Sequence, residues 1–293
     1  MKKKLIEYIK LIRVKHYFKN LLIFLPLFFS GQFLKTDKLI STIIGFISFS
    51  LVASMIYIFN DYKDIEKDRK HNIKKNRPLA AGTVSKKESI ILLIILFFLN
   101  IGVVFYLTTR INSYSFIYLE LIYLIINILY SIGLKKVPIL DLVILVSGFM
   151  IRLVFGGIIN DITISNWLYL TVLSVSFYMA LGKRRNELLK QKDTSREVLK
   201  KYNKDFLDKF MNIFQTLTIV FYSLWCIDGG TNTNLKNYTI LTIPMILIIL
   251  MKYSLNIEQD TYGDPIDIIL EDKVLILLCI VFGVAMGIIL YIK

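Results

Sequence analysis

Long apolar stretches recur along the whole 293-residue chain, and this repetition constrains its fold more than any single motif. Stretches of about 18 or more mainly apolar residues are long enough to cross the hydrocarbon core of a bilayer as helices. Hydrophobic residues make up 55% of the sequence, above the roughly 45–50% that is usual for a soluble domain. The sequence therefore predicts an all-α, polytopic membrane helix bundle.

The apolar pattern predicts nine transmembrane helices within a single domain that covers residues 1–293. The expected spans are 18–34, 39–60, 89–109, 114–133, 138–159, 166–183, 209–228, 238–256 and 273–292. Two long charged segments, 61–88 and roughly 184–208, lie between spans and contain no Gly or Ser runs. We expect both to be partly helical and to form caps over a cavity in the bundle.

The net charge of +14 is distributed unevenly along the chain. Thirty of the 36 Lys and Arg residues fall on the N-terminal side of the predicted bundle, five fall on the opposite side, and Arg152 falls within a span. Because Lys and Arg favour the cytoplasmic side, we expect a multi-pass protein of the cell inner (cytoplasmic) membrane. The N-terminus and both long segments would be cytoplasmic, and the C-terminus would lie outside. This asymmetry explains the charge without nucleic-acid binding.

Four oxygen-bearing residues follow the second predicted span at helical spacing: Asn60, Asp61, Asp64 and Asp68. On a helix this spacing places their side chains on one face. Clustered oxygen ligands suit Mg²⁺, which usually bridges protein carboxylates to the phosphates of a substrate. The other interpretation is an ordinary charged loop between two helices, which has no reason to space its carboxylates in this way.

A cationic stretch follows the carboxylates directly, and three of its residues are candidates for binding phosphate: Arg69, His71 and Arg77. Guanidinium groups match phosphate oxygens in charge and geometry. An exposed loop histidine is the alternative for His71. Acidic and basic clusters side by side at a membrane interface indicate metal-dependent diphosphate chemistry on a lipid.

The second charged segment opens with Lys183, Arg184 and Glu187 within one helical turn, and Arg196 follows further along. Basic groups at this position could hold a diphosphate across the cavity from the metal, with Glu187 orienting one of them or binding a second metal. Arg196 is a further candidate for substrate binding. The alternative is a positive-inside anchor with Glu187 as a surface ion-pair partner.

Arg152 is the strong cation expected inside a span, where burial in hydrocarbon costs about 2.5–3.5 kcal/mol on insertion scales. Such a residue usually faces a cavity or a partner. Tyr130, Lys135 and Asp141 outline a further rim of the predicted site, although snorkelling of Lys135 and helix capping by Asp141 explain them equally well. Lys19 could contact an anionic substrate group or could serve as an interface anchor.

The chain resembles the UbiA superfamily of intramembrane prenyltransferases over essentially its whole length. That superfamily carries the motif Asn-Asp-x-x-Asp-x-x-x-Asp after the second of nine helices, and Asn60, Asp61, Asp64 and Asp68 match it. Within the superfamily the closer resemblance is to polyprenyl-phosphate phosphoribosyltransferases of the decaprenyl-phosphate type. The matching elements are Lys19-Asn20, Asp68-Arg69-Lys70-His71, Arg77-Pro78, Tyr130-Ser131, Lys135, Asp141, Arg152, Lys183-Arg184 with Glu187, and Gly263-Asp264-Pro265.

The resemblance implies a reaction as well as a fold. It implies that Mg²⁺ on Asp61, Asp64 and Asp68 holds phosphoribosyl diphosphate, and that a polyprenyl phosphate attacks the ribose. Catalytic roles would fall to the three carboxylates with Lys183, Arg184 and Glu187, and the product would feed cell-envelope polysaccharide synthesis. The second Asp-rich loop of aromatic-acceptor enzymes is matched only partly by Asp193…Glu197, which favours the phosphoribosyl subgroup.

Two other functions stay open at this point. The nearer one is a UbiA-type prenyltransferase that binds an isoprenyl diphosphate through the metal and transfers the isoprenyl chain to an aromatic or other small acceptor. The more distant one is a non-enzymatic membrane transporter. Transporters often contain inverted repeats and helices broken by Gly or Pro, and neither feature is evident in this sequence.

Overall fold

The computed structural model describes residues 2–70, 74–190, 197–228, 236–259 and 265–292, and these residues form helices and turns without a strand. The elements of the first half, in chain order, are α1 (Lys2–Ile12), η1 (Val14–Phe24), α2 (Leu25–Phe29), α3 (Thr36–Lys63), α4 (Ile65–Arg69), η2 (Lys74–Asn76), α5 (Lys86–Ile111), α6 (Ser115–Ile132) and η3 (Leu134–Lys136). Those of the second half are α7 (Leu140–Asn160), α8 (Asn166–Lys190), η4 (Glu197–Lys201), α9 (Lys204–Asp228), α10 (Lys236–Thr239), η6 (Ile240–Thr242), α11 (Ile243–Gln259), α12 (Pro265–Glu271) and α13 (Lys273–Tyr291).

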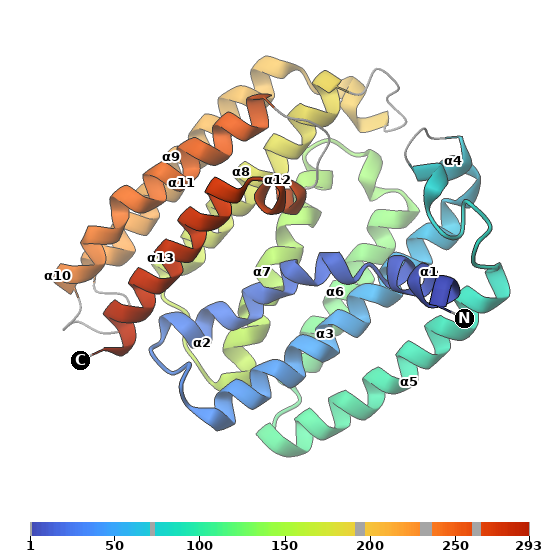
Figure 1. Ribbon diagram of the computed structural model, residues 1–293, viewed down its shortest axis with the longest axis horizontal. Helices are drawn as coiled ribbons and strands as arrows, with labels where there is room; N and C mark the ends of the chain where they lie inside the picture. Colours follow the sequence, from blue (N-terminus) through green and yellow to red (C-terminus); the bar gives the residue numbers. More distant parts are fainter. Residues whose placement is uncertain (1, 71–73, 191–196, 229–235, 260–264, 293) are drawn as a thin grey trace.

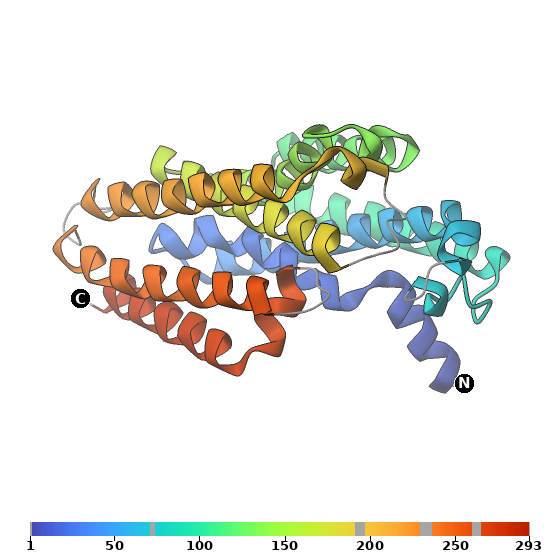
Figure 2. The same ribbon diagram turned by 90° about the horizontal axis from the view of Figure 1, so that it is seen from above.

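The long helices form two groups that meet along α7. Figure 1 shows α9, α11 and α13 together on one side of the molecule, and α3 and α5 on the other. The main packing pairs are α8 with α9, α3 with α5, and α7 with α8, η1 and α6. In the view from above, α11 and α13 lie apart from α5, α6 and α7 (Figure 2). Helices that follow one another in the sequence therefore mostly lie beside one another.

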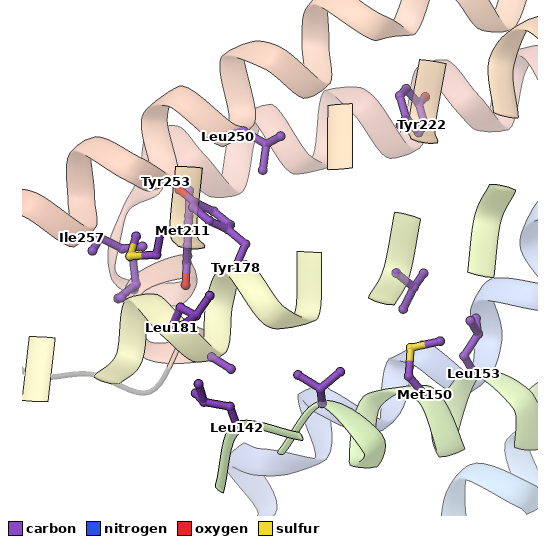
Figure 3. Packing of buried hydrophobic residues seen from close by; sticks show 14 of the residues in the cluster. Leu142, Met150, Leu153, Tyr178, Leu181, Met211, Tyr222, Leu250, Tyr253 and Ile257 are labelled. Atoms are coloured by element: carbon purple, nitrogen blue, oxygen red, sulfur yellow. The ribbon is translucent and has the colours of Figure 1, made fainter. Parts of the chain in front are cut away.

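Each group of helices has its own apolar core. The core of the first group gathers around Phe49, Phe116 and Phe155, which are fully buried and pack edge to face on one another. The core of the second group lies between α7, α8, α9 and α11, and Figure 3 shows Tyr178 and Tyr253 close together within it, where their rings pack edge to face. Such close-packed aromatic and aliphatic side chains hold the helices in fixed positions.

Seven helical segments of the described chain are long and apolar enough to cross a membrane. They are Thr36–Lys63, Lys86–Ile111, Ser115–Ile132, Leu140–Asn160, Lys204–Asp228, Ile240–Gln259 and Lys273–Tyr291. The apolar stretches of α3 and α7 are 61% buried, whereas those of α5 and α13 are 17% and 11% buried. α3 and α7 are therefore central, and α5 and α13 expose most of their surface.

The remaining two expected spans, 18–34 and 166–183, fall on η1 with α2 and on α8. The first differs from a regular α-helix, because η1 is an eleven-residue 3₁₀ helix and α2 has only five residues. A Cβ on Gly156 of α7 would lie 2.0 Å from the carbonyl oxygen of Ile23, so the backbones of η1 and α7 touch directly. Pro26 stands in the first turn of α2, where its missing N–H removes no helical hydrogen bond.

Candidate active site

The predicted acidic face is built from the last turn of α3, the residue that follows it, and α4. Asp64 joins the two helices with φ −94° and ψ 10°. Hydrogen bonding between residues four apart continues through the bend, from the Asp64 N–H to the Asn60 carbonyl at 3.0 Å and from the Asp68 N–H to the Asp64 carbonyl at 2.8 Å. The carboxylates therefore keep approximately helical spacing, although two helices carry them.

Two arginines hold Asp61 and Asp68. Arg77 Nη1 donates to Asp61 Oδ1 at 3.0 Å and to Asp68 Oδ2 at 2.8 Å. Arg13 Nη2 donates to Asp61 Oδ1 at 2.5 Å from the junction of α1 and η1, where Arg13 has the left-handed conformation with φ 54°. Asp61 is only 2% exposed, so both guanidinium groups neutralise a buried carboxylate.

The third carboxylate, Asp64, turns toward the connection between α6 and α7. Lys135 Nζ donates to Asp64 Oδ2 at 2.9 Å. The Ser131 hydroxyl, at the end of α6, forms hydrogen bonds with the Asn60 side chain and with the Asn127 carbonyl. α6 is thereby fixed against the end of α3, with the Asp64 carboxylate between them.

These residues border a cavity of about 500 Å³. Ten Lys and Arg residues line it, against three carboxylates from Asp64, Asp68 and Glu197. A cavity with this excess of cations favours a polyanionic ligand. Part of the wall is apolar or aromatic, including Ile144, Phe149 and Tyr123, so the same space also offers contacts for an apolar group.

Arg152 of α7 also lines this cavity and is 4% exposed. Its guanidinium donates to the Asn20 side chain at 2.6 Å, to the Gly148 carbonyl at 2.6 Å and to the Tyr123 hydroxyl at 2.8 Å. The rings of Phe49 and Tyr123 lie 4.9 and 4.8 Å from its central carbon. These hydrogen-bond partners are all neutral, so within the described part of the chain the charge stays available to an anion in the cavity.

A separate ion pair lies behind the cavity wall. Arg184 Nε donates to Asp141 Oδ2 at 2.7 Å, and Arg184 Nη1 donates to Glu187 Oε2 at 2.8 Å. The Tyr202 hydroxyl donates to Asp141 Oδ1 at 2.6 Å and accepts from the Ile139 N–H at 2.7 Å. Burial and the hydrogen bond to Asp141 raise the pKa of Tyr202 above its ordinary value, which keeps this hydroxyl protonated as a donor.

The structure brings nine of the predicted site residues to the cavity: Lys19, Asn60, Asp64, Asp68, Arg77, Tyr130, Lys135, Arg152 and Lys183. Five others do not line it: Asp61, Arg69, Asp141, Arg184 and Glu187. Arg69 points instead to the Ala80 carbonyl and to Glu66. His71 and Arg196 lie outside the residues that the structure describes, as does the Gly263-Asp264 part of the late motif.

Several cavity-lining residues were not singled out from the sequence. They are Arg13, His16, Tyr57, Lys67, Tyr123, Asn127 and Lys136. A signal for two of them exists, because Tyr123 and Asn127 recur with Ser131 every four residues and form a polar stripe along the mainly apolar α6. Arg13 has no comparable local signal, since its partner Asp61 lies 48 residues away.

The donor set at the cavity fits a hard divalent cation that shares its coordination with a substrate. In the described ranges, no three His, Cys, Asp or Glu side chains form a ready-made metal cage. Mg²⁺ bound to a phosphorylated substrate usually takes only one or two protein carboxylates together with phosphate oxygens and water. Asp64 and Asp68 both border the cavity and meet this requirement, whereas Asp61 is enclosed by Arg13 and Arg77.

Comparison with known proteins agrees with this fold. The sequence profile of the UbiA prenyltransferase family matches residues 22–269. A solved UbiA homologue from Archaeoglobus fulgidus bound to DMAPP and Mg²⁺ superposes with a TM-score of 0.70, covering 98% of this chain and all of that one at 15% identity. The chain therefore belongs to the UbiA prenyltransferase family, and it is a multi-pass membrane transferase.

Within the family, the sequence is similar to decaprenyl-phosphate phosphoribosyltransferases. It is 31% identical to that of Mycolicibacterium smegmatis over 97% of this chain and 92% of the relative. It is 30% identical to that of Corynebacterium glutamicum over 96% of this chain and 86% of the relative.

Proposed function

We propose that this protein transfers 5-phosphoribose from phosphoribosyl diphosphate to a polyprenyl phosphate in a Mg²⁺-dependent reaction. The observation that carries the proposal is the presence of two cationic positions in one cavity. Arg77 and Lys135 lie beside the carboxylates, and Arg152 lies deeper along α7. Arg152 is three helical turns beyond Asp141 at the start of α7, which corresponds to roughly 16 Å at 1.5 Å per residue.

Two anion positions suit a reaction in which both substrates carry phosphate. Phosphoribosyl diphosphate would place its diphosphate between Arg77, Lys135 and the Asp64 and Asp68 carboxylates. The phosphate of the polyprenyl acceptor would lie where Lys19 and Arg152 supply positive charge, with its chain against the apolar wall of the cavity. The names of the similar enzymes from Mycolicibacterium smegmatis and Corynebacterium glutamicum support these two substrates.

In the proposed reaction, a phosphate oxygen of the acceptor forms a bond to C1 of the ribose while the C1–O bond to diphosphate breaks. Diphosphate leaves, and the product is a polyprenyl phosphoribosyl phosphodiester. The attacking oxygen is already anionic, so the step needs no general base. Arg77, Lys135 and Lys183 would stabilise the charge that develops on the diphosphate. Mg²⁺ held by Asp64 and Asp68 would supply further neutralisation of that charge.

The membrane topology of the protein is proposed to be the one expected from the sequence. The nine spans would form one domain, with η1–α2 and α8 joining the seven apolar helices. The positive-inside distribution supports a cytoplasmic position for the N-terminus, for the Asp cluster and for the cap segments, and an external C-terminus, in an inner membrane. The lipid product would then be made on the cytoplasmic face, where it could enter cell-envelope polysaccharide synthesis.

The deciding experiment supplies the purified protein in lipid nanodiscs with radiolabelled phosphoribosyl diphosphate and a polyprenyl phosphate. We expect Mg²⁺-dependent transfer of label into the lipid fraction. A parallel reaction contains a labelled isoprenyl diphosphate and an aromatic acceptor, the substrates of an ordinary prenyltransferase. Absence of lipid-soluble ribose label would contradict the proposal, and label in the aromatic product would assign prenyl transfer instead.

A further inference from the structure

α1 carries apolar side chains that the rest of the described protein leaves uncovered. Leu5, Ile6 and Ile9 are 61%, 51% and 44% exposed. At about 100° per residue these three side chains fall within an arc of about 100° on one face of the helix. Lys3 and Lys10, seven residues apart, both lie along one edge of this face and are exposed.

The opposite face of α1 is attached to the protein. Leu11 is fully buried, and Glu7 accepts a hydrogen bond from the Thr83 hydroxyl at 2.8 Å. Lys4 forms an ion pair with Glu88 at the start of α5. These contacts fix the rotation of the helix about its own axis, so the Leu5–Ile6–Ile9 face turns away from the bundle. Figure 2 shows α1 at the end of the molecule, steeply inclined to the long helices.

We infer that α1 is an interfacial helix whose Leu5–Ile6–Ile9 face enters the acyl-chain boundary of the bilayer and whose flanking lysines bind anionic lipid headgroups. An amphipathic helix with cations beside its apolar face has the chemistry that such a surface selects. A second copy of the chain fits less well. Two antiparallel α1 helices packed face to face would bring Lys3 and Lys10 of both copies together on one edge, and like charges repel.

The position of α1 also affects the carboxylate cluster. Arg13 directly follows α1 and reaches Asp61 from its left-handed turn. The position of α1 on the lipid surface therefore helps to set where this guanidinium enters the carboxylate cluster. The choice of an anionic leaflet rests on the cytoplasmic orientation proposed above, but the attachment to lipid does not depend on the reaction.

The test measures which face of α1 contacts lipid in the full chain. A spin label is placed at Ile9→Cys or Lys4→Cys in a background in which Cys226 and Cys279 are replaced by Ala, and the protein is reconstituted in nanodiscs. We expect the ratio of oxygen to nickel-chelate accessibility to be several-fold higher at position 9 than at position 4. Equal ratios at the two positions would overturn the inference. If the cysteine-free background fails to fold, a photoreactive amino acid at position 9 of the otherwise unchanged chain must cross-link to lipid.

A second arm tests the charge of the lipid. The accessibility ratio at position 9 is compared in phosphatidylcholine with and without phosphatidylglycerol, for Lys3→Gln/Lys10→Gln and for the matched control Lys200→Gln/Lys201→Gln. We expect phosphatidylglycerol to raise the ratio in the parent chain and in the control, and to have a smaller effect in the Lys3/Lys10 variant. An identical response in both double variants would contradict headgroup binding by these lysines. Cross-linking of position 9 to another protein copy would assign the face to oligomerisation instead.

Discussion

The Arg184 guanidinium and the Asp141 carboxylate form an ion pair in which both side chains are completely buried, with Nε of Arg184 2.7 Å from Oδ2 of Asp141. The pair joins α8 to the start of α7, and it forms further hydrogen bonds with Tyr202, Glu187 and Tyr130. Both residues were predicted to act on the substrate, and neither is among the residues that line the cavity. Their geometry supports a role in holding α7 and α8 at fixed positions.

Replacing Arg184 with Met should destabilise the protein strongly. The substitution leaves the Asp141 carboxylate buried without its cation, and breaking a buried pair in this way typically costs about 3–5 kcal/mol. The matched control is Arg69→Met, because the Arg69–Glu66 pair is exposed on both sides, and exposed pairs contribute about 0–1 kcal/mol. Unfolding in detergent, followed by circular dichroism, compares the two. Similar losses of stability in both variants would contradict the structural role of Arg184.

Asp64→Asn should abolish most of the transfer activity while the fold persists. The carboxylate borders the cavity and is partly exposed, so its loss removes a ligand for the metal that would hold the diphosphate, and leaves the buried core unchanged. We expect kcat to fall about 100-fold or more, as is usual when a group that stabilises developing charge is removed. Asp37→Asn, at the opposite end of α3 and almost fully exposed, should retain parental activity. Parental kcat in Asp64→Asn would remove Asp64 from the site.

Arg152→Gln should weaken the binding of the polyprenyl phosphate acceptor more than the binding of the phosphoribosyl diphosphate donor. The side chain keeps a polar group near Asn20 and Tyr123 but loses the buried charge. A charge-assisted contact to phosphate contributes about 1.5–3 kcal/mol, so we expect KM for the polyprenyl phosphate to rise roughly 10- to 100-fold. KM for phosphoribosyl diphosphate should change little. The opposite pattern, with only the donor affected, would place the diphosphate at Arg152.

Removal of divalent cations should stop the reaction reversibly. Asp64 and Asp68 supply oxygen ligands that suit Mg²⁺, and the excess of Lys and Arg in the cavity alone does not replace a metal that shields the diphosphate. We expect EDTA to reduce transfer to background and added Mg²⁺ to restore it. Circular dichroism should be unchanged throughout, because Arg13, Arg77 and Lys135 already neutralise the carboxylates. Full activity in EDTA would contradict the metal requirement.

Gly156→Ala should be among the most damaging small substitutions in the chain. Its Cβ would lie 2.0 Å from the Ile23 carbonyl oxygen, so η1 and α7 would have to separate. Forced overpacking of this kind costs about 1–3 kcal/mol or more. In Gly283→Ala of α13 the new Cβ meets nothing within 4 Å, and the greater helix propensity of Ala should leave stability unchanged or slightly higher. Thermal unfolding midpoints in detergent separate the two variants. Equal midpoints would show that the two helices do not touch at Gly156.

The sequence was sufficient to predict the helices and the local acidic motif, because both depend on neighbouring residues. Apolar length identified the long helices, and helical spacing identified Asn60, Asp64 and Asp68 as a group that meets at one cavity. The charge of Arg152 within a span likewise indicated that it faces a cavity. These are properties that periodicity and transfer energy determine directly.

Partnerships between distant residues could not be predicted in the same way. Arg13 reaches Asp61 across 48 positions and Lys135 reaches Asp64 across 71, and nothing local to either residue specifies the meeting. Lys183 lines the cavity, whereas the adjacent Arg184 is fully buried outside it. Which of the two side chains faces the cavity depends on the rotation of α8 about its axis. Tertiary packing sets that rotation.

The narrow winding of η1 changes how far a short piece of chain extends. A 3₁₀ helix advances about 2.0 Å per residue against 1.5 Å for an α-helix, so the eleven residues of η1 and the five of α2 together extend about 30 Å. That distance equals the hydrocarbon thickness for which an α-helix needs about 20 residues. The 3₁₀ winding thus gives this short segment the length that a crossing requires. Lys19 and Asn20 lie part-way along it, and the Asn20 side chain accepts a hydrogen bond from Arg152 of α7.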